Sequence, residues 1–401
     1  MLRIAQCTDT FLPVVDGVGR VVLAYAETLS RMGHEVSVSC PMYDTGSRGG
    51  YPFEIIDYTA FKVPTAPQYK TGAAVLDSHY KKRIGMIPLN IVHAHSPFGA
   101  GCEALRLARE RRIPLVASFH SKYYDDFYKA TKSKALSKIA LRKVVSFYHR
   151  CNEVWAVSES TAEVLKQYGY QGPVRVMPNG VTLREPRADM VRRVEEQHAL
   201  GNLPLLLFVG QINWKKNILR VLEAAVLLRD SGTPFMLLLA GQGPDRAAVQ
   251  EKIVQLGLSN HAKLIGHIKN MDELDALYAR ASVFTFPSLY DNAPMVVREA
   301  AVMGTPAVLV ADSDAAEIIH DGVNGFLCRD DSADLYQVLK EALSNPEWTQ
   351  KVGISARETI PQPWETIMAN AVEAYRELIA SGRSPGPRRT RRAAAASRGT
   401  R

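Results

Sequence analysis

The sequence predicts an α/β protein built from two consecutive doubly wound, Rossmann-like domains. Short apolar runs alternate with longer stretches of helical period, which indicates parallel sheets covered by helices on both faces. The length of 401 residues favours two domains over one very wide sheet. A polar stretch rich in Arg and Glu, residues 182–202, separates two series of apolar runs and is the expected linker.

The first series predicts a domain over residues 1–184. It begins with a strand, "RIAQCTD", which is followed by a glycine-containing loop and a helix over 21–32. Its further strands are expected at 35–40, 91–95, 114–120, 153–158 and 174–178. Crossovers between such strands are almost always right-handed.

The second series predicts a domain over residues 202–360, with strands at 203–210, 235–241, 262–268, 282–287, 306–310 and 325–328. A last helix over 364–381 has apolar residues at helical spacing, and we expect it to pack back onto the first domain. Ligands of doubly wound sheets bind beyond the carboxyl ends of the strands. Two such domains would therefore face a central cleft lined by the loops that follow their strands.

The formal net charge of +8 comes mostly from the chain's end. Residues 383–401 contain seven arginines and no acid, so the rest is nearly neutral and gives no case for nucleic-acid binding. We expect this low-complexity tail to be disordered and solubilising rather than a basic arm for anionic lipid. Five scattered cysteines without a CxxC pair, and no apolar run long enough to span a membrane, predict a cytoplasmic protein.

Two loops of the first domain carry candidate binding residues. In "TDTFLPVVDGVGR", Gly17 and Gly19 let the backbone approach a ligand just before a helix begins, although an ordinary turn uses glycine too. The third glycine of the NAD fingerprint is missing. His120 ends a strand, where a histidine is as often functional as structural. No Ser/His/Asp order or HExxH pattern accompanies it.

In the second domain, "VGQINWKKN" places Lys215 and Lys216 near a helix start, where ammonium groups suit a phosphate. Gly241 and Gly243 of "AGQGPD" form another turn at a strand end, a weak signal alone. The acidic triplet "DSD" at 312–314 lacks a third oxygen ligand, so we expect no metal there.

The stretch "PSLYDNAPMVVREAA", residues 287–301, is the most specific. Pro294 suits the first turn of a helix, which leaves the N–H groups of Ala293, Met295 and Val296 available to oxygen atoms of a ligand. Two carboxylates flank this turn, and carboxylates accept hydrogen bonds from sugar or ribose hydroxyls. The plainer reading is that Asp291 precedes the cap and Glu299 pairs with Arg298 or a lysine.

The chain resembles retaining glycosyltransferases of the GT-B fold, family 4. The resemblance covers roughly residues 1–380. It rests on the first loop, "FHSKY", "AVSES", "PNGV", "VGQINWKKN", "AGQGP", the two acids eight residues apart, and "DGVNGFL", all in the family's order and spacing. Short segments such as "TDTFLP" look similar to those of the branch of the family that glycosylates diacylglycerol or phosphatidylinositol.

This resemblance implies roles for the candidate residues. Glu299 would hold the nucleotide ribose, and Asp291 the donor-sugar hydroxyls, beside the backbone of residues 293–296. Lys216 would neutralise the diphosphate, which Gly17 and Gly19 would adjoin, and His120 would lie near the sugar. Two positions depart from the family pattern. Gln211 stands where an arginine is usual, and Asp291 where a glutamate is usual.

The mechanism so implied needs no protein nucleophile, no metal and no cofactor besides the nucleotide-sugar donor. Lys216, helix N-termini and glycine N–H groups would stabilise charge on the leaving diphosphate. A diphosphate oxygen would take the acceptor proton, giving retention, and domain closure would exclude water.

The acceptor is expected to be a membrane lipid or a glycan. Residues 128–150 contain seven Lys or Arg and no acid, with apolar residues on another helical face. Such a helix lies on an anionic membrane as readily as it packs in a domain. Two alternatives to transfer are a nucleotide-sugar 2-epimerase and a non-catalytic protein that binds nucleotide sugar or membrane.

Overall fold

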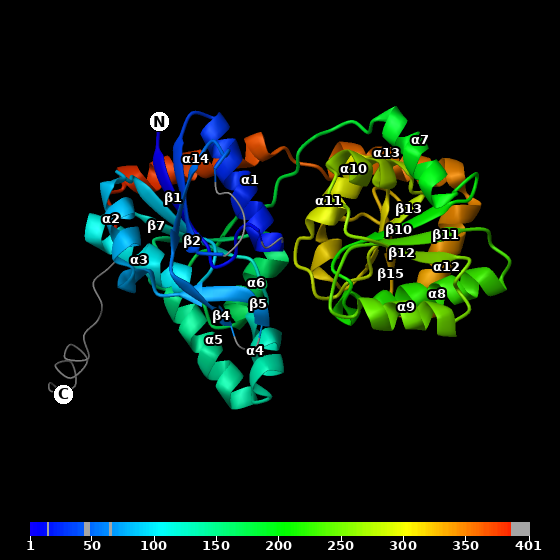
Figure 1. Cartoon of the computed structure of the whole chain (residues 1–401), viewed down its shortest axis with the longest axis horizontal. Coiled ribbons are helices and arrows are strands. Elements are labelled where there is room, and N and C mark those ends of the chain that lie inside the picture. The colour runs from blue at the N-terminus through cyan, green and yellow to red at the C-terminus, as the bar shows by residue number, and fades with distance from the viewer. Residues whose placement is uncertain (14–15, 44–48, 64–65, 386–401) are drawn as a thin grey trace. The chain divides into compact units, whose positions relative to one another are not determined.

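The computed structural model describes residues 1–13, 16–43, 49–63 and 66–385, and it divides the chain into two compact units. Unit 1 consists of Met1–Pro178 and the chain from Trp364 onward, and unit 2 of Asn179–Pro363. Each unit is a parallel sheet with helices packed on it (Figure 1), which confirms the predicted fold class of two doubly wound domains. The cleft expected between them stays a prediction. Most of the tail predicted to be disordered, 386–401, lies outside the described residues.

The sheet of unit 1 has the order β3-β2-β1-β6-β7-β8-β9, and neighbouring strands run parallel. Its strands are β1 (Arg3–Cys7), β2 (Glu35–Pro41), β3 (Glu54–Tyr58), β6 (Ile91–Ala94), β7 (Leu115–Phe119), β8 (Glu153–Ala156) and β9 (Arg175–Val176). Strand order reverses between β1 and β6, because the chain first builds outward to β3 and then returns to the other side of β1. The crevice beyond the carboxyl ends of these two strands is where doubly wound sheets bind ligands.

The helices of unit 1 are α1 (Gly17–Arg31), α2 (Ser78–Met86), α3 (Gly99–Arg111), α4 (Tyr123–Thr131), α5 (Lys134–Tyr148), α6 (Glu159–Gln167) and α14 (Trp364–Ala380), with the short turn η1 (Ala74–Leu76). The predicted helix at 364–381 is therefore present, and it packs against α1 within unit 1. Its Tyr375 ring stacks on Trp155 of β8 at 5.3 Å, so the far end of the sequence completes the core of the first sheet.

Unit 2 repeats the same topology, with the strand order β12-β11-β10-β13-β14-β15 and parallel pairing. Its strands are β10 (Leu205–Val209), β11 (Met236–Ala240), β12 (Ala262–Gly266), β13 (Val283–Thr285), β14 (Ala307–Val310) and β15 (Phe326–Cys328). Their apolar residues are nearly all buried, as expected for strands covered on both faces. The order here reverses between β10 and β13.

The helices of unit 2 are α7 (Ala188–His198), α8 (Ile218–Asp230), α9 (Arg246–Gln255), α10 (Met271–Arg280), α11 (Met295–Val302), α12 (Ser332–Ser344) and α13 (Pro346–Thr359), with the short turns η2 (Trp214–Lys216) and η3 (Asp314–Ile318). Together with the sheet they enclose one continuous apolar core.

The prediction that residues 182–202 form a linker is wrong. Most of this stretch is helix α7, which packs on α10 inside unit 2. Met190 and Val194 are buried there, and the Arg184 guanidinium holds the buried Asp275 carboxylate through two bonds of 2.7 and 2.8 Å. The stretch looks polar because only one helical face carries apolar side chains, while the charged residues lie on the others.

Other differences concern the two edge strands of the first sheet and a separate two-stranded sheet in unit 1. The strand expected at 174–178 shortens to two residues, β9. Strand β3 and the antiparallel hairpin of β4 (Ala60–Val63) and β5 (Ala66–Gly72) were not predicted. In β3 the exposed Glu54 and the partly exposed Asp57 stand beside apolar residues, and no residue of β4 is buried, so neither strand shows a long apolar run or a clear alternation.

Candidate functional site

The predicted binding residues of unit 2 lie at the carboxyl ends of β10 and β13, on either side of the point where strand order reverses. The loop after β10 carries Gln211, Lys215 and Lys216, and the loop after β13 carries Asp291. These two strands pair directly, through Leu206 with Val283. Sheet topology therefore brings together two loops that are about 75 residues apart in sequence.

Lys216 and Asp291 form an ion pair with 2.6 Å between Nζ and Oδ1. Their side chains keep 14% and 21% of their accessible area, so the pair is partly shielded from water. The second carboxylate oxygen accepts a 2.6 Å hydrogen bond from the hydroxyl of the buried Ser288. An ammonium group has three N–H donors, and a carboxylate has about four lone-pair sites. The pair is therefore fixed in place and retains hydrogen-bonding capacity for a ligand.

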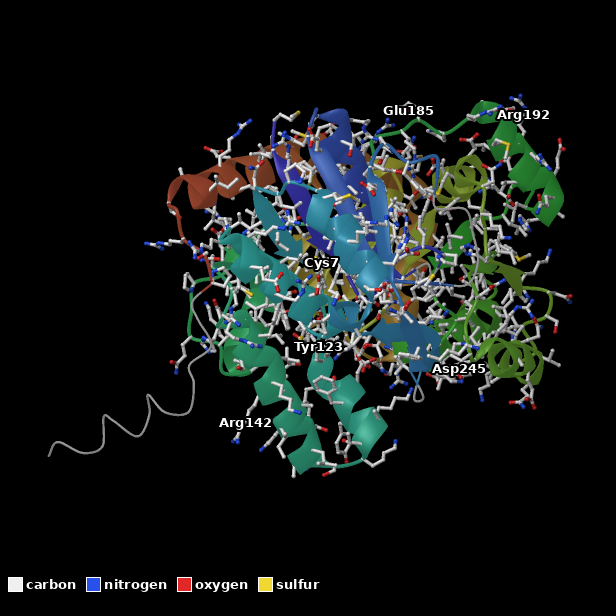
Figure 2. The ribbon with its side chains drawn as sticks, turned by 60° about the vertical axis from the view of Figure 1, so that its left-hand side comes forward. Cys7, Tyr123, Arg142, Glu185, Arg192 and Asp245 are labelled. Atoms are coloured by element: carbon white, nitrogen blue, oxygen red, sulfur yellow. The ribbon has the colours of Figure 1, made fainter. Side chains whose placement is uncertain are left out.

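The turn that carries the lysines is held by its own side chains. Asn213 caps η2 by accepting from the N–H of Lys215 at 3.0 Å, and Asp245 accepts from the N–H of Trp214 at 2.9 Å. Asp245, at the start of α9, is labelled in Figure 2. Lys215 places its Nζ 4.4 Å from the centre of the Tyr290 ring. One cation is thus paired with a carboxylate, and its neighbour lies over an aromatic face.

Gly241 and Gly243 allow the loop after β11 to pack against the loop that carries the lysines. A Cβ atom on Gly241 would lie 1.8 Å from the carbonyl oxygen of Gly210, and one on Gly243 would lie 2.1 Å from that of Ile212. The two loops are also joined by the N–H of Ile212, which donates to the oxygen of Gln242 at 2.9 Å. These glycines let the loop after β11 pack closely against the loop after β10. Gln211, in the loop after β10, is exposed.

The helix that follows Asp291 begins one residue later than predicted. Pro294 is the N-cap of α11, with extended geometry (φ −67°, ψ 126°), and Met295 is the first helical residue. The side chain of Asn179 donates to the carbonyl oxygen of Ala293 at 3.2 Å, which anchors the entry to the helix. The N–H groups of Met295 and Val296 belong to the first turn, where a helix supplies no acceptor. Both residues are half-exposed.

Glu299 lies one turn further into α11 and is only 3% exposed. Its Oε2 accepts a hydrogen bond from the Tyr278 hydroxyl at 3.2 Å. The neighbouring Arg298 is buried and donates to the carbonyl oxygen of Ile360 at 3.0 Å. Burial lowers the pKa of Arg298 to about 10. One oxygen of the Glu299 carboxylate is therefore held by Tyr278 on α10.

Neither a metal cluster nor a membrane span is evident in the described part of the chain. No group of three or more His, Cys, Asp and Glu side chains there is arranged to hold a metal ion, and this includes the acidic triplet at 312–314. No helix among the same residues combines the length and apolarity needed to cross a bilayer.

In unit 1, Gly17 and Gly19 form the first turn of α1, with Asp16 as N-cap. The Asp16 carboxylate accepts from the N–H of Gly19 at 2.7 Å, so this donor, expected to face a diphosphate, is bonded within the chain. Burial raises the pKa of Asp16, while the hydrogen bond from Gly19 lowers it. Gly17 is exposed, and a Cβ atom there would meet nothing within 4 Å.

His120 follows β7 and is half-buried in unit 1. Its Nε2 lies 3.1 Å from Nδ1 of His95, which comes directly after β6. The neighbouring carboxyl end of β1, Cys7, lies inside the unit (Figure 2). Burial lowers the pKa of His120 to about 4, so the ring is neutral near pH 7. A neutral imidazole donates one hydrogen bond and accepts one, and it carries no charge to offer a phosphate.

Several residues that support these groups were not predicted: Asp16, His95, Asp245, Tyr278 and Ser288. Their side chains contact a predicted residue or its backbone across the fold. His95 left a sequence signal, because "IVHAH" places two histidines in an otherwise apolar run, where polar side chains are rarely buried without partners. Asp16 left another, because an aspartate just before a helix is a common N-cap.

Two family models match the chain. The model described as Glycosyltransferase Family 4 matches residues 15–185, and that described as Glycosyl transferases group 1 matches residues 192–359. Among curated proteins, the alpha-monoglucosyldiacylglycerol synthase of Acholeplasma laidlawii is 22% identical over 391 residues, covering 94% of this chain and 98% of that protein. The GDP-mannose-dependent alpha-mannosyltransferase of Corynebacterium glutamicum is 24% identical over 398 residues, covering 94% and 90%.

Among solved structures, the HepE protein of Anabaena, crystallised in complex with UDP, superimposes with a TM-score of 0.75 at 18% identity. The match covers 94% of this chain and all of that one. At this identity the likeness concerns the fold, which is the GT-B arrangement of two Rossmann-like domains.

Proposed function

Because this chain belongs to the group 1 and family 4 glycosyltransferases, we propose that it transfers a hexose from a UDP- or GDP-sugar to an acceptor hydroxyl with retention of configuration. The proposed acceptor is a membrane lipid such as diacylglycerol, reached at the cytoplasmic face of the membrane. The observation that carries the proposal is the Lys216–Asp291 pair at the strand-order reversal of unit 2.

Donor binding follows from the groups around that pair. The N–H donors of Lys216 that Asp291 does not use would bind the diphosphate, together with the first-turn N–H groups of Met295 and Val296. Lys215, in the same turn, adds positive charge beside it. Asp291 would accept from the hexose hydroxyls, and Glu299, held by Tyr278, from the ribose diol. Gln211 would hydrogen-bond without adding charge.

In the transfer step, the bond between the anomeric carbon and the diphosphate oxygen breaks as the acceptor oxygen bonds to the same face of that carbon. A diphosphate oxygen takes the acceptor proton, so the nucleoside diphosphate leaves with it. Lys216 and the α11 N-terminus stabilise the negative charge that grows on the leaving group. The proposal routes no step through a metal ion or a cofactor. In unit 1, His120 would bind a substrate hydroxyl, and Gly17 would adjoin the phosphates.

The lipid acceptor is supported by the surface of α5. Lys134, Lys138, Arg142 and Lys143 are exposed on this helix, and Figure 2 shows Arg142 on its outer side. Val144 and Phe147 lie in the core, but Leu136 and Ile139 are 54% and 52% exposed. Core packing therefore accounts for only part of the apolar face. Exposed leucine and isoleucine among cations suit an anionic membrane. Two of the matching relatives are named as diacylglycerol-glycolipid synthases.

The experiment has two stages. Thermal shifts with UDP-, GDP- and ADP-sugars identify the donor, since a ligand that binds the folded state raises the melting temperature. Transfer from that donor is then measured with vesicles that contain diacylglycerol and anionic lipid, with and without EDTA, and the anomeric configuration of the product is read by NMR. We expect an α-linked glycolipid from an α-linked donor, with EDTA causing no loss.

Controls separate the parts of the proposal. Incubation with donor alone would yield an epimerised sugar if the protein were a 2-epimerase. Leu136→Ser with Ile139→Ser should weaken binding to anionic vesicles and leave transfer to a soluble acceptor intact. Transfer to glycans but never to lipids would contradict the acceptor assignment, and inversion at the anomeric carbon would contradict the mechanism.

A further inference from the structure

Arg298 is a buried cation that the proposed transfer does not use. It lies on α11, directly before Glu299, and only 5% of it is exposed. Burial lowers its pKa, and the negative charge of Glu317 acts in the opposite direction. Taking an arginine out of water is costly, whereas an apolar side chain of similar size packs between helices without that cost. The buried charge therefore calls for an explanation other than stability.

The Arg298 guanidinium lies at the C-terminus of helix α13. Its Nη1 donates a 3.0 Å hydrogen bond to the carbonyl oxygen of Ile360, the C-cap residue of α13. Carbonyl groups at the end of a helix have no partner within it and carry partial negative charge, so a cation there is favourable. Just after α11, the carbonyl oxygen of Gly304 would lie 2.1 Å from a Cβ atom on Gly353 of α13. Helix α13 is thus held against α11 at two places.

The chain that leaves α13 pairs with the chain that enters unit 2. The N–H of Val181 donates to the carbonyl oxygen of Gln362 at 2.8 Å, and Val181 forms a β-bridge with Pro363. Two residues before Val181, the side chain of Asn179 donates to the carbonyl oxygen of Ala293 at 3.2 Å, at the entry to α11. Asn179 and Pro363 are the first and last residues of unit 2, so both boundaries of the unit take part in these contacts.

These contacts form a closed loop within unit 2. The loop runs from α11 to α13, then to residues 361–363, then to residues 179–181, and back to the start of α11. Its buried members are Asn179, Val181, Arg298 and Ile360. Water therefore competes little for the hydrogen bonds that they make. A helix held at one point can pivot, whereas ties near its start and along its length fix its direction.

We propose that Arg298 and Asn179 are positioning residues of the donor site, which hold α11 between the two boundaries of unit 2 and so set the direction of its first-turn N–H groups. The inference rests on the proposed function, which places the diphosphate at Met295 and Val296. Catalysis depends on such directions, since a displacement of about 1 Å can lower a rate about 10²-fold. The guanidinium makes a directed bond that an apolar side chain cannot make, which explains why a charge is buried here.

The same loop links donor binding to both boundaries of unit 2. A diphosphate that orders the first turn of α11 also favours the hydrogen bonds to Ala293 and Ile360, and through them the pairing of Val181 with Gln362. Linkage between binding equilibria is reciprocal, so the loss of one of these bonds weakens donor binding.

Hydrogen–deuterium exchange of the full chain tests the loop without nucleotide or turnover. Arg298→Met keeps much of the side chain's length but removes its donors, and we expect faster exchange of the Val181 N–H, on the far side of the loop. Asn179→Leu should likewise speed exchange of the Ile360 N–H, which donates to the carbonyl oxygen of Ala356. The matched control is Lys351→Met, an exposed lysine on α13 that should change neither. Faster exchange confined to the surroundings of each substitution would overturn the proposal.

Calorimetric titration with UDP and GDP then measures the effect on the donor site. We expect about tenfold weaker binding in Arg298→Met and in Asn179→Leu, the size of one lost hydrogen bond, and most of the affinity back in Arg298→Lys, which keeps a cationic donor. In the wild type the bound nucleotide should slow exchange of the Val181 N–H as well as that of α11, and in Arg298→Met that of α11 alone.

The outcomes separate this inference from the proposed function. Affinity equal to the wild type in both variants would refute the positioning role. If the wild type binds the nucleotide but transfers no hexose, the proposed transfer is wrong while the positioning of α11 stands. If it binds neither nucleotide, both are wrong. If Arg298→Met does not fold, Asn179→Leu supplies the exchange and the affinity measurements by itself.

Discussion

The sharpest prediction concerns Lys216, which faces Asp291 at 2.6 Å. Replacing it with Met removes one positive charge beside the proposed diphosphate and leaves the Asp291 carboxylate in its place, still held by Ser288. A unit charge about 4 Å from another is worth about 4 kcal/mol at an effective dielectric constant of about 20. Exchange with water and counterions reduces this, so we expect kcat/KM to fall by about 10²–10³, the usual loss for one transition-state donor.

The partner residue sharpens the test. In Lys216→Met the diphosphate meets an uncompensated carboxylate, whereas Lys216→Met with Asp291→Asn removes both charges. We therefore expect UDP or GDP affinity to fall in the single variant and to recover partly in the double variant, because unfavourable charge repulsion is removed. Turnover should stay low in the double variant, since the neutral amide that replaces the Asp291 carboxylate would hold the hexose hydroxyls less well.

The assay combines calorimetric titration with the nucleoside diphosphate and steady-state kinetics with the donor. The matched control is Lys351→Met, an exposed lysine on α13 in the same unit, for which both quantities should equal those of the wild type. If Lys216→Met binds the nucleoside diphosphate and turns over as the wild type does, Lys216 is a structural partner of Asp291 only, and the reasoning fails.

Three further predictions follow from the same structure. Gln211 is exposed beside the proposed diphosphate site, so Gln211→Arg should lower the KM for the donor several-fold in low salt. The effect should be smaller at about 0.5 M salt, where charges are strongly screened. An unchanged KM would show that this residue is not part of the site. Glu299→Gln keeps the shape of the side chain but loses a charged acceptor, and we expect about tenfold weaker nucleoside diphosphate binding by calorimetry, whereas equal affinity would contradict the ribose assignment. The lowered pKa of His120, about 4, means that the unfolded chain takes up this proton first as the pH falls below about 6.5. The contribution of His120 to the free energy of unfolding is thus present above about pH 6.5 and lost towards pH 4. Between pH 7 and 4.5 we therefore expect the free energy of unfolding to fall about 2–3 kcal/mol less in His120→Gln than in wild type, as measured by denaturant titration. Burial raises the pKa of Asp9 to about 6, so this residue changes stability with pH in the opposite direction, but equally in both proteins. Equal pH dependence of the unfolding free energy in the two proteins would show that His120 titrates normally.

The order of strands and helices could be predicted well, because strands covered on both faces are continuous apolar runs and glycine-rich or polar loops separate them. Helix α7 was mistaken for a linker since its apolar face, Met190 and Val194, is narrow and its charges are many. Strands β3 and β4 were missed for the related reason that charged or exposed residues interrupt their apolar residues, which weakens the pattern.

The sequence by itself determined which residue types follow the strands: glycines, lysines, a histidine and Asp291 in the loops, and Glu299 on the helix after one of them. Local spacing also determined the turn into α11, since a proline, a carboxylate before it and an apolar run after it are adjacent in the chain. What only the tertiary structure decided is how these groups pair. Lys216 meets Asp291, Tyr278 holds one oxygen of Glu299, Asp16 takes the Gly19 N–H, and His95 meets His120. Most of these contacts join residues far apart in sequence, which meet because parallel strands place their carboxyl ends at one edge of a sheet.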